Sequence, residues 1–329
     1  MGYDGKILAR ATEKYGQLIA RHERELDQRA ALLEGRFPRL KEIDTLLRRS
    51  VIQAIHAALS AGSDAGDQVR IQQKRNLALQ EERGRILTEQ GYPATFLDRE
   101  ALCPLCGDTG YRESGMCQCL AKVYREEQNR ELHETTGMKP MYLHEISFET
   151  YSDQRTGGSV SARENMQYTV SRCEAIIRER GGRGNFFFSG PPGSGKTHVA
   201  VCMGYSAAAA GISVVYETAG RLLSRYEDAR FRRDDETARA EIARCENCDL
   251  LILDDLGTEM TSSVSNASLY QLLSTRLTAG RGCVFITNQP YEELRRRYPP
   301  QILSRFEGEF QVMRFFGTDL RQNKRGNFY

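Results

Sequence analysis

The chain has 329 residues, a length that corresponds to two domains of ~150 residues each. Its composition, 40% hydrophobic and 27% charged, is that of a globular protein, and no apolar run approaches the ~20 residues that a membrane span requires. The 46 Lys and Arg residues nearly balance the 44 Asp and Glu residues, so the net charge of +2 excludes nucleic-acid binding through bulk charge. We therefore expect no membrane contact, and any DNA contact should be local.

The N-terminal sequence MGYDGKILARATEKYGQ lacks the basic start, the apolar stretch and the small-residue cleavage site of a secretory signal. This favours a cytoplasmic location, where thiols stay reduced. The nine cysteines then need an explanation other than disulfide bonds.

Residues 1–100 are predicted to form a helical region. From Ile7 to about Glu89 the sequence is rich in Arg, Glu, Gln, Leu and Ala, and apolar residues recur at helical spacing. Breaks are expected near Phe37 and Pro38 and again at residues 61–66. No pattern in this region indicates catalysis, and its charged faces are typical of a solvated helical bundle.

Four cysteines within seventeen residues follow this region: Cys103, Cys106, Cys117 and Cys119. Two close thiol pairs around a glycine-containing loop can close a tetrahedral zinc site, with no open position for catalysis. An iron–sulfur cluster, a redox pair and unligated thiols are the alternatives. We assign a zinc-binding module to residues 101–135, with a polar helix from Cys119 to about His133. A lone further pair, Cys245 and Cys248, is interpreted as packing residues.

Residues 136–160 are interpreted as a linker, and residues 161–329 as an α/β domain. Four apolar segments alternate with helical stretches, at residues 185–189, 214–217, 250–254 and 283–287. Alternation of this kind predicts a parallel sheet with flanking helices.

The first of these segments runs into a glycine loop, GPPGSGKT at residues 190–197, which precedes a helical stretch. This is the phosphate-loop pattern in its required context, because glycines let backbone amides converge on phosphates at a helix N-terminus. Lys196 would reach the β- and γ-phosphates of ATP, and the hydroxyl of Thr197 would ligate Mg²⁺. The predicted ATP-binding residues are Gly190, Pro191, Pro192, Gly193, Ser194, Gly195, Lys196, Thr197 and His198.

Two acids and an amide follow the later strands. Asp254 and Asp255 come after apolar residues 250–253, and we assign Asp254 to Mg²⁺, largely through water, and Asp255 to polarising the attacking water. Adjacent side chains on a strand point to opposite sides, so the two acids should divide these roles. Asn288 follows the strand at 283–287 and can bond both water and the γ-phosphate, although asparagine is common in such turns for backbone reasons alone.

These motifs, with LSRF at residues 303–306 and GTDLR at residues 317–321, occur in the order found in AAA+ ATPases. The segment LILDDLGTE at residues 251–259 resembles the DnaC/DnaI-type helicase loaders and the related IstB-type transposase helper ATPases, and the resemblance covers about residues 140–329. It implies that Asn288 is sensor 1, that Arg305 is an arginine finger reaching a neighbouring subunit's nucleotide, and that Arg321 is sensor 2. The cysteine segment resembles the zinc-containing region of DnaI-type loaders, which couples a helicase-binding domain to the ATPase.

The resemblance also places a helical insertion that lines a single-stranded DNA channel after residue 217. Arginines and aromatic residues alternate there, which suits backbone tracking and base stacking, but acids dilute the charge. The basic and aromatic residues are Arg221, Arg225, Tyr226, Arg230, Phe231, Arg232 and Arg233, and the acids are Glu227, Asp228, Asp234 and Asp235. The three arginines at 295–297 are a second candidate DNA surface.

The motifs predict an ATPase, and the resemblance implies that it binds a hexameric replicative helicase, loads it onto single-stranded DNA and self-associates through its ATPase domain. Its cofactors would be ATP, Mg²⁺ and Zn²⁺. One alternative is a transposition helper ATPase, which shares the core but usually lacks a cysteine-bearing module. The other is a non-hydrolysing nucleotide switch whose zinc module binds a protein.

Overall fold

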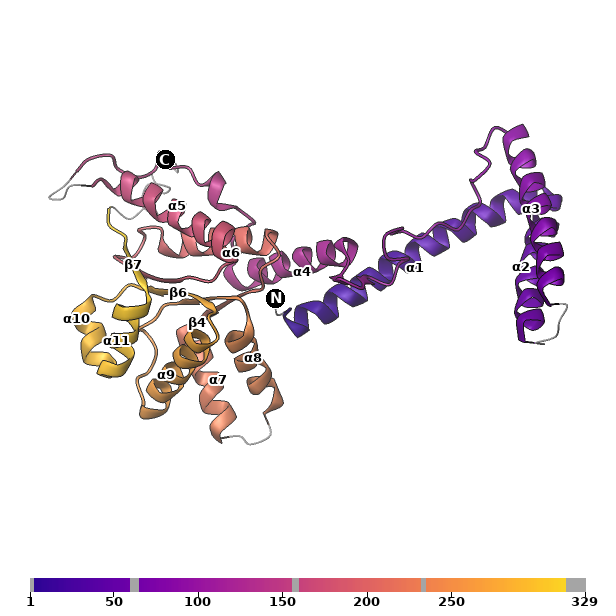
Figure 1. The fold of residues 1–329 in the computed structure, drawn as a ribbon. Coiled ribbons are helices and arrows are strands. Elements are labelled where there is room, and N and C mark those ends of the chain that lie inside the picture. The colour runs from indigo at the N-terminus through magenta and orange to yellow at the C-terminus, as the bar shows by residue number, and fades with distance from the viewer. Residues whose placement is uncertain (1–2, 60–64, 156–159, 232–234, 318–329) are drawn as a thin grey trace. The chain divides into compact units, whose positions relative to one another are not determined.

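The computed structural model of the chain describes residues 3–59, 65–155, 160–231 and 235–317, with side chains for all of these except 51–59 and 65–69. The chain divides into two compact units, whose α-helices and some of whose strands are labelled in Figure 1. Met1–Thr12 and Leu120–Tyr329 form the first, which we call the sheet unit, and Glu13–Cys119 form the second, the helical unit. Among the described helices, none combines the length and apolar character that crossing a membrane requires.

Three long helices account for most of the helical unit, as predicted. They are α1 (Gly5–Arg36), which begins in the sheet unit, α2 (Pro38–Leu59) and α3 (Ala65–Glu89). The break before α2 has a local cause, because proline disfavours helix at the preceding residue yet fits the first helical position. Leu33, Leu40 and Leu87 are buried together where the three helices meet. The second predicted break falls mainly on residues 60–64, outside the described residues.

A short hairpin carries the cysteine segment. Strands β1 (Tyr111–Arg112) and β2 (Gly115–Met116) are antiparallel, and α4 (Gln118–Thr136) follows directly. The polar helix predicted from Cys119 is therefore confirmed, with its end three residues later than expected.

A five-stranded parallel sheet forms the centre of the sheet unit, with the strand order β4-β5-β6-β3-β7. The strands are β3 (Asn185–Ser189), β4 (Val214–Thr218), β5 (Leu250–Asp254), β6 (Gly282–Thr287) and β7 (Gln311–Arg314). The parallel sheet and its first four strands are as predicted. The edge strand β7 was not predicted, because only Met313 of its four residues is buried and the segment shows no apolar run.

Helices cover both faces of the sheet, because successive strand residues point to opposite sides. Phe186 and Phe188 pack in one core with α5 (Ala162–Arg180) and α6 (Lys196–Ala209), whereas Phe187 packs in the other. The second core is formed with α7 (Ala219–Phe231), α8 (Glu236–Asn247), α9 (Ser263–Thr278), α10 (Tyr291–Arg297) and α11 (Pro300–Glu309). A single 3-10 turn, η1 (Leu143–Glu145), lies in the segment predicted as a linker.

Candidate nucleotide site and cysteine cluster

The glycine loop joins the end of β3 to the first residue of α6. At Gly190 the backbone has φ +151°, and a Cβ there would lie 2.1 Å from the carbonyl oxygen of Phe315, so only glycine fits. Gly195 has φ +95°, and a Cβ there would lie 2.7 Å from the Tyr151 hydroxyl. These two glycines therefore allow the backbone conformation in which the loop leads into α6.

Lys196 is buried at the first position of α6, and its ammonium group lies inside the loop. Its Nζ donates hydrogen bonds to the carbonyl oxygens of Gly190 (2.8 Å) and Pro191 (2.7 Å). A bound phosphate would compete with these neutral carbonyl oxygens for the ammonium group, because its oxygens are negatively charged acceptors.

The two acids at the end of β5 differ in environment. Asp254 is 4% exposed, and its Oδ2 accepts a hydrogen bond of 2.7 Å from the Tyr216 hydroxyl. Its Oδ1 accepts one of 2.7 Å from the amide of Asp255. Asp255 is exposed, and its Oδ1 lies 3.4 Å from the donating Nδ2 of Asn288 at the end of β6. The strand ends between the two acids, so one faces the interior and the other the solvent.

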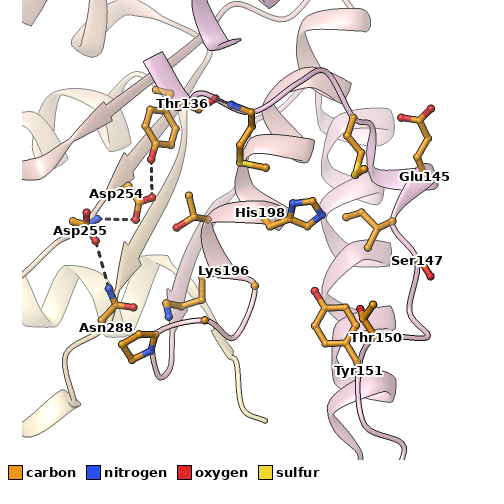
Figure 2. Close-up of a pocket in the computed structure, with 18 residues that line it drawn as sticks. Thr136, Glu145, Ser147, Thr150, Tyr151, Lys196, His198, Asp254, Asp255 and Asn288 are labelled. Atoms are coloured by element: carbon orange, nitrogen blue, oxygen red, sulfur yellow. Dashed lines mark hydrogen bonds between the residues drawn. The ribbon is translucent and has the colours of Figure 1, made fainter. Parts of the chain in front are cut away.

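These groups line one cavity of about 970 Å³, drawn in Figure 2. The size is that of ligand pockets, which are ~300–1,000 Å³. Of the predicted residues, the structure brings these together: Pro192, Gly193, Gly195, Lys196, Thr197, His198, Asp254, Asp255 and Asn288. Gly190, Pro191 and Ser194 belong to the same loop and bond Lys196.

The opposite wall comes from residues 136–151, all of which the sequence predicted only as part of a linker or domain entry. It contributes Thr136, Met138, Met141, Glu145, Ile146, Ser147, Thr150 and Tyr151. Burial raises the pKa of the Tyr151 hydroxyl to about 12, so it stays a neutral donor. No spacing pattern marks this wall in the sequence, because its residues reach the cavity through the packing of η1 against α6.

The two arginines implied by the family resemblance are not among the described residues that line this cavity. Arg305 lies on α11, with its guanidinium carbon 5.6 Å from the centre of the Tyr270 ring on α9. Arg321 lies outside the described residues.

The predicted DNA-contacting residues after β4 fall on α7. Arg221, Arg230 and Phe231 are exposed, Phe231 by 74%. The expectation that Tyr226 is available for base stacking is wrong, because its ring is buried and its hydroxyl donates to Glu246 (2.8 Å). Residues 232–234 lie outside the described residues.

The arginines of the second candidate surface end α10. Arg296 pairs with Glu293 at 2.8 Å, and Arg297 donates to the backbone carbonyl of Glu259. Arg295 is exposed. Only part of this run is therefore available to a phosphate backbone.

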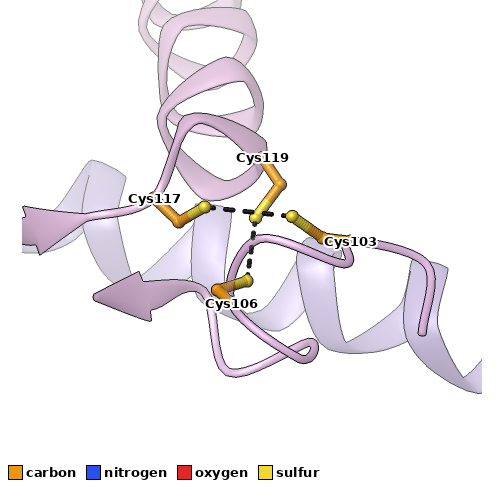
Figure 3. A group of neighbouring side chains, drawn as sticks. All are labelled: Cys103, Cys106, Cys117 and Cys119. Carbon is orange, nitrogen blue, oxygen red and sulfur yellow. Dashed lines mark hydrogen bonds between the residues drawn. The ribbon is translucent and has the colours of Figure 1, made fainter.

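The four cysteines of the helical unit form one cluster (Figure 3), with all four Sγ atoms within 4.8 Å of one another. The Sγ atoms of Cys103 and Cys117 are 3.8 Å apart, and those of Cys106 and Cys119 are 3.5 Å apart. Tetrahedral zinc with Zn–S bonds of about 2.3 Å requires sulfur separations of about 3.8 Å. The thiols therefore fit zinc in number, chemistry and spacing.

The chain resembles known ATP-binding proteins over the region that contains this cavity. The family model for IstB-like ATP binding protein matches residues 146–304. The chain is 25% identical over 198 residues to the replicative helicase loader DnaC of Escherichia coli K12, covering 59% of this chain and 76% of that protein. It is 27% identical over 192 residues to the uncharacterized protein YdaV of the same organism, covering 57% and 72%.

The solved structures include a DnaC helicase loader (TM-score 0.41, 17% identity, 52% of this chain and 96% of that one). They also include DnaI (TM-score 0.44, 16% identity, 57% and 94%). The sequence matches contain an ATP-binding region, so the predicted resemblance to AAA+ ATPases of the DnaC and IstB types is confirmed.

Proposed function

We propose that the chain binds and hydrolyses ATP and uses this cycle to load a replicative helicase onto single-stranded DNA. The observation that supports it most strongly is the convergence of Lys196, Asp254, Asp255 and Asn288 on one cavity beside the glycine loop. The relative DnaC is named a replicative helicase loader, and this similarity also supports the proposal.

Each residue has a distinct role in this proposal. The loop amides and Lys196 hold the β- and γ-phosphates, while the Thr197 hydroxyl and Asp254 hold Mg²⁺, which prefers such oxygen ligands. Bound Mg²⁺ neutralises charge on the phosphates. Asp255 polarises the attacking water, and Asn288 positions it through the bond between the two side chains. The wall at residues 136–151 offers apolar and hydroxyl groups to the base and ribose.

Hydrolysis in this proposal depends on assembly. Arg305 acts on the nucleotide of a neighbouring subunit, and Arg321 acts as sensor 2. An arginine supplied across a subunit boundary stabilises charge on the transferring phosphate.

The remaining parts contact partners. One zinc ion, held by the four cysteines, stabilises the module at 101–135, and the helices at 1–100 bind the hexameric helicase. Residues 136–160 then connect these regions to the ATPase domain at 161–329. Exposed Arg221, Arg230 and Phe231 on α7, with Arg295, contact single-stranded DNA. A cytoplasmic location fits the nine free thiols.

Helicase loading is tested with the full chain. The purified protein should co-purify with the replicative helicase of its host and stimulate helicase unwinding of DNA in the presence of ATP. Lys196→Ala should retain helicase binding and lose stimulation. Consistent absence of helicase binding by the wild-type chain would contradict the loader function.

A transposition helper is the second candidate, because the matching family model is the IstB-like one. A putative insertion-sequence ATP-binding protein of Sinorhizobium fredii is 33% identical over 115 residues, covering 35% of this chain and 37% of that protein. Binding to a transposase in place of a helicase would favour this candidate. ATP binding without hydrolysis, whether or not single-stranded DNA is present, would favour the nucleotide switch.

A further inference from the structure

Tyr216 lies on β4 in a position to reach Asp254. The parallel register pairs Thr218 with Asp254, and side chains two residues apart on a strand share a face. Tyr216, two residues before Thr218, therefore lies on the same face of the sheet as Thr218 and Asp254. Its hydroxyl extends along the sheet to Asp254. The hydrogen bond of 2.7 Å to Oδ2 is one of the dashed lines in Figure 2.

Both oxygens of the Asp254 carboxylate therefore have a donor. The backbone of Asp255 supplies one and Tyr216 supplies the other, so the plane of the carboxylate is fixed from two sides. Each oxygen keeps a second acceptor position, which leaves the group able to accept from water. An ionised carboxylate can only accept hydrogen bonds, so the Tyr216 hydroxyl is the donor in this pair.

We infer that Tyr216 is a positioning residue that holds Asp254 in the orientation needed for the Mg²⁺ of bound ATP. The inference rests on the proposed ATPase function. Partners that orient metal ligands typically contribute about 10- to 100-fold to metal affinity. Because Asp254 is assigned to Mg²⁺ largely through water, we expect the lower end of that range.

Tyr216→Phe tests the inference, because it removes the hydroxyl and keeps the ring. Binding of a fluorescent, non-hydrolysable ATP analogue is measured at increasing Mg²⁺ concentrations, and then in EDTA, which removes Mg²⁺. The half-saturating Mg²⁺ concentration should rise about tenfold, while affinity in EDTA stays unchanged. Electron paramagnetic resonance of Mn²⁺ bound with the analogue gives a second readout that does not depend on hydrolysis.

Tyr226→Phe is the matched control, since Tyr226 also donates to a carboxylate, that of Glu246, at 2.8 Å. It should lower thermal stability as much as Tyr216→Phe does, yet leave the Mg²⁺ titration unchanged. An unchanged Mg²⁺ titration in Tyr216→Phe, or an equal shift in both variants, overturns the inference.

A double-mutant cycle with Asp254→Asn separates a direct effect from a general loss of structure. In the Asp254→Asn background the hydroxyl has no charged ligand to orient, so Tyr216→Phe should change the Mg²⁺ titration no further. A full additional shift would overturn the inference. If the wild-type chain binds no ATP analogue at all, the proposed ATPase function is wrong. That outcome differs from the results that overturn only the role of Tyr216, in which the wild-type chain does bind the analogue.

Discussion

Asp255 adopts a backbone conformation that few side chains tolerate. Its φ of +55° lies in the left-handed region, which costs most residues about 1–2 kcal/mol but is accessible to Asp and Asn. This turn ends β5 immediately after Asp254 and leaves the Asp255 carboxylate beside Asn288. The same backbone requirement therefore accounts both for the end of the strand and for the exposure of the second acid.

Asp255→Asn should isolate the chemistry from the fold. Asparagine keeps the left-handed backbone, so thermal stability and ATP affinity should match the wild type. Hydrolysis should fall by about 100-fold or more, because a positioned base contributes about 10²–10⁴-fold. Single-turnover hydrolysis and analogue binding measure the two quantities. Equal losses in both would show that Asp255 serves binding instead of water activation.

The site residues that were predicted from the sequence itself, without the family resemblance, share one property: each lies in a local pattern. The glycine loop and the acids after an apolar run are contiguous, so strand and turn rules suffice to place them. Tyr216 and Tyr151 were missed because their roles depend on contacts across the fold. Tyr216 meets Asp254 through strand register, and Tyr151 meets Gly195 through packing. No periodicity encodes either contact.

At the scale of elements, the pairing of α11 with α9 sets the position of Arg305. Its guanidinium lies over the face of Tyr270, an arrangement worth about 0.5–1 kcal/mol at exposed sites. Tyr270→Leu should therefore release Arg305 and reduce assembly-dependent hydrolysis about two- to fivefold. Tyr270→Phe keeps the ring and loses only the hydroxyl, which also hydrogen-bonds Arg305, so it should lose less assembly-dependent hydrolysis than Tyr270→Leu.

Mixed assemblies provide the measurement for Tyr270. A Lys196→Ala chain can supply Arg305 to an Arg305→Ala chain, so a mixture of the two should recover hydrolysis that neither shows alone. Tyr270→Leu placed in the Lys196→Ala chain should reduce this recovery. Placed in the Arg305→Ala chain, it should have no effect. The reverse pattern would contradict the proposed role of Tyr270.

Arg276 on α9 joins three elements, and no carboxylate of the described residues pairs with it. It is fully buried, and its guanidinium donates to the carbonyl oxygens of Cys245 (2.5 Å), Cys248 (3.0 Å) and Gly282 (2.5 Å). Its Nε lies 3.2 Å from the Sγ of Cys283. Cys245 and Cys248 are therefore packing residues at the end of α8, as predicted, and their carbonyl groups are what Arg276 binds.

Arg276→Met should destabilise the sheet unit by about 3 kcal/mol, because buried carbonyl groups lose their donors. Urea unfolding measures the free energy. Arg281→Met is the matched control, since Arg281 makes only a 3.4 Å contact to the Glu246 carbonyl, and it should cost less than about 1 kcal/mol. Equal effects from the two variants would contradict this account.

At the scale of the whole molecule, the first residues of the chain belong to the sheet unit. Arg244 on α8 holds them, with Nε 2.6 Å from Asp4 Oδ2 and Nη2 2.6 Å from Glu131 Oε1 on α4. Ile7 and Ala11 are buried on the following turns. The sequence predicted residues 1–100 as one helical region, because residues 3–12 have the same mixture of charged and apolar residues as the helices that follow. Composition alone therefore does not reveal that residues 3–12 belong to the sheet unit.

This ion-pair cluster predicts a pH dependence. Burial acts to raise the pKa of Glu131, but the charge and hydrogen bond of Arg244 outweigh it and hold that pKa below the ordinary 4.5. A carboxyl with a lowered folded-state pKa contributes stability that is present above 4.5 and is lost as the pH falls through the folded value. The charged groups around Glu131 are Lys6, Arg10, Asp4, Glu127, Glu241 and Arg244.

Arg244→Met should lower the unfolding free energy at neutral pH by about 3 kcal/mol, since it removes the ion-pair partner of the buried Asp4 carboxylate and leaves Glu131 with Lys6 and Arg10 alone. It should also reduce the loss of stability below pH 4.5, because Glu131 would then titrate closer to its ordinary value. Urea unfolding at several pH values measures both effects. Arg178→Met, which removes an exposed arginine, is the control and should change neither. An acid-induced loss as steep as that of the wild type would contradict the role of Arg244.

Metal removal should separate the two units functionally. The four thiols lie in the helical unit, whereas every residue assigned to ATP lies in the sheet unit. Metal analysis should find one zinc per chain, and Cys106→Ser should lose it. Because a closed zinc site contributes folding free energy only where its ligands lie, this variant should keep wild-type affinity for the ATP analogue and lose helicase binding. Loss of nucleotide binding together with zinc would show that the two units are coupled through the metal site.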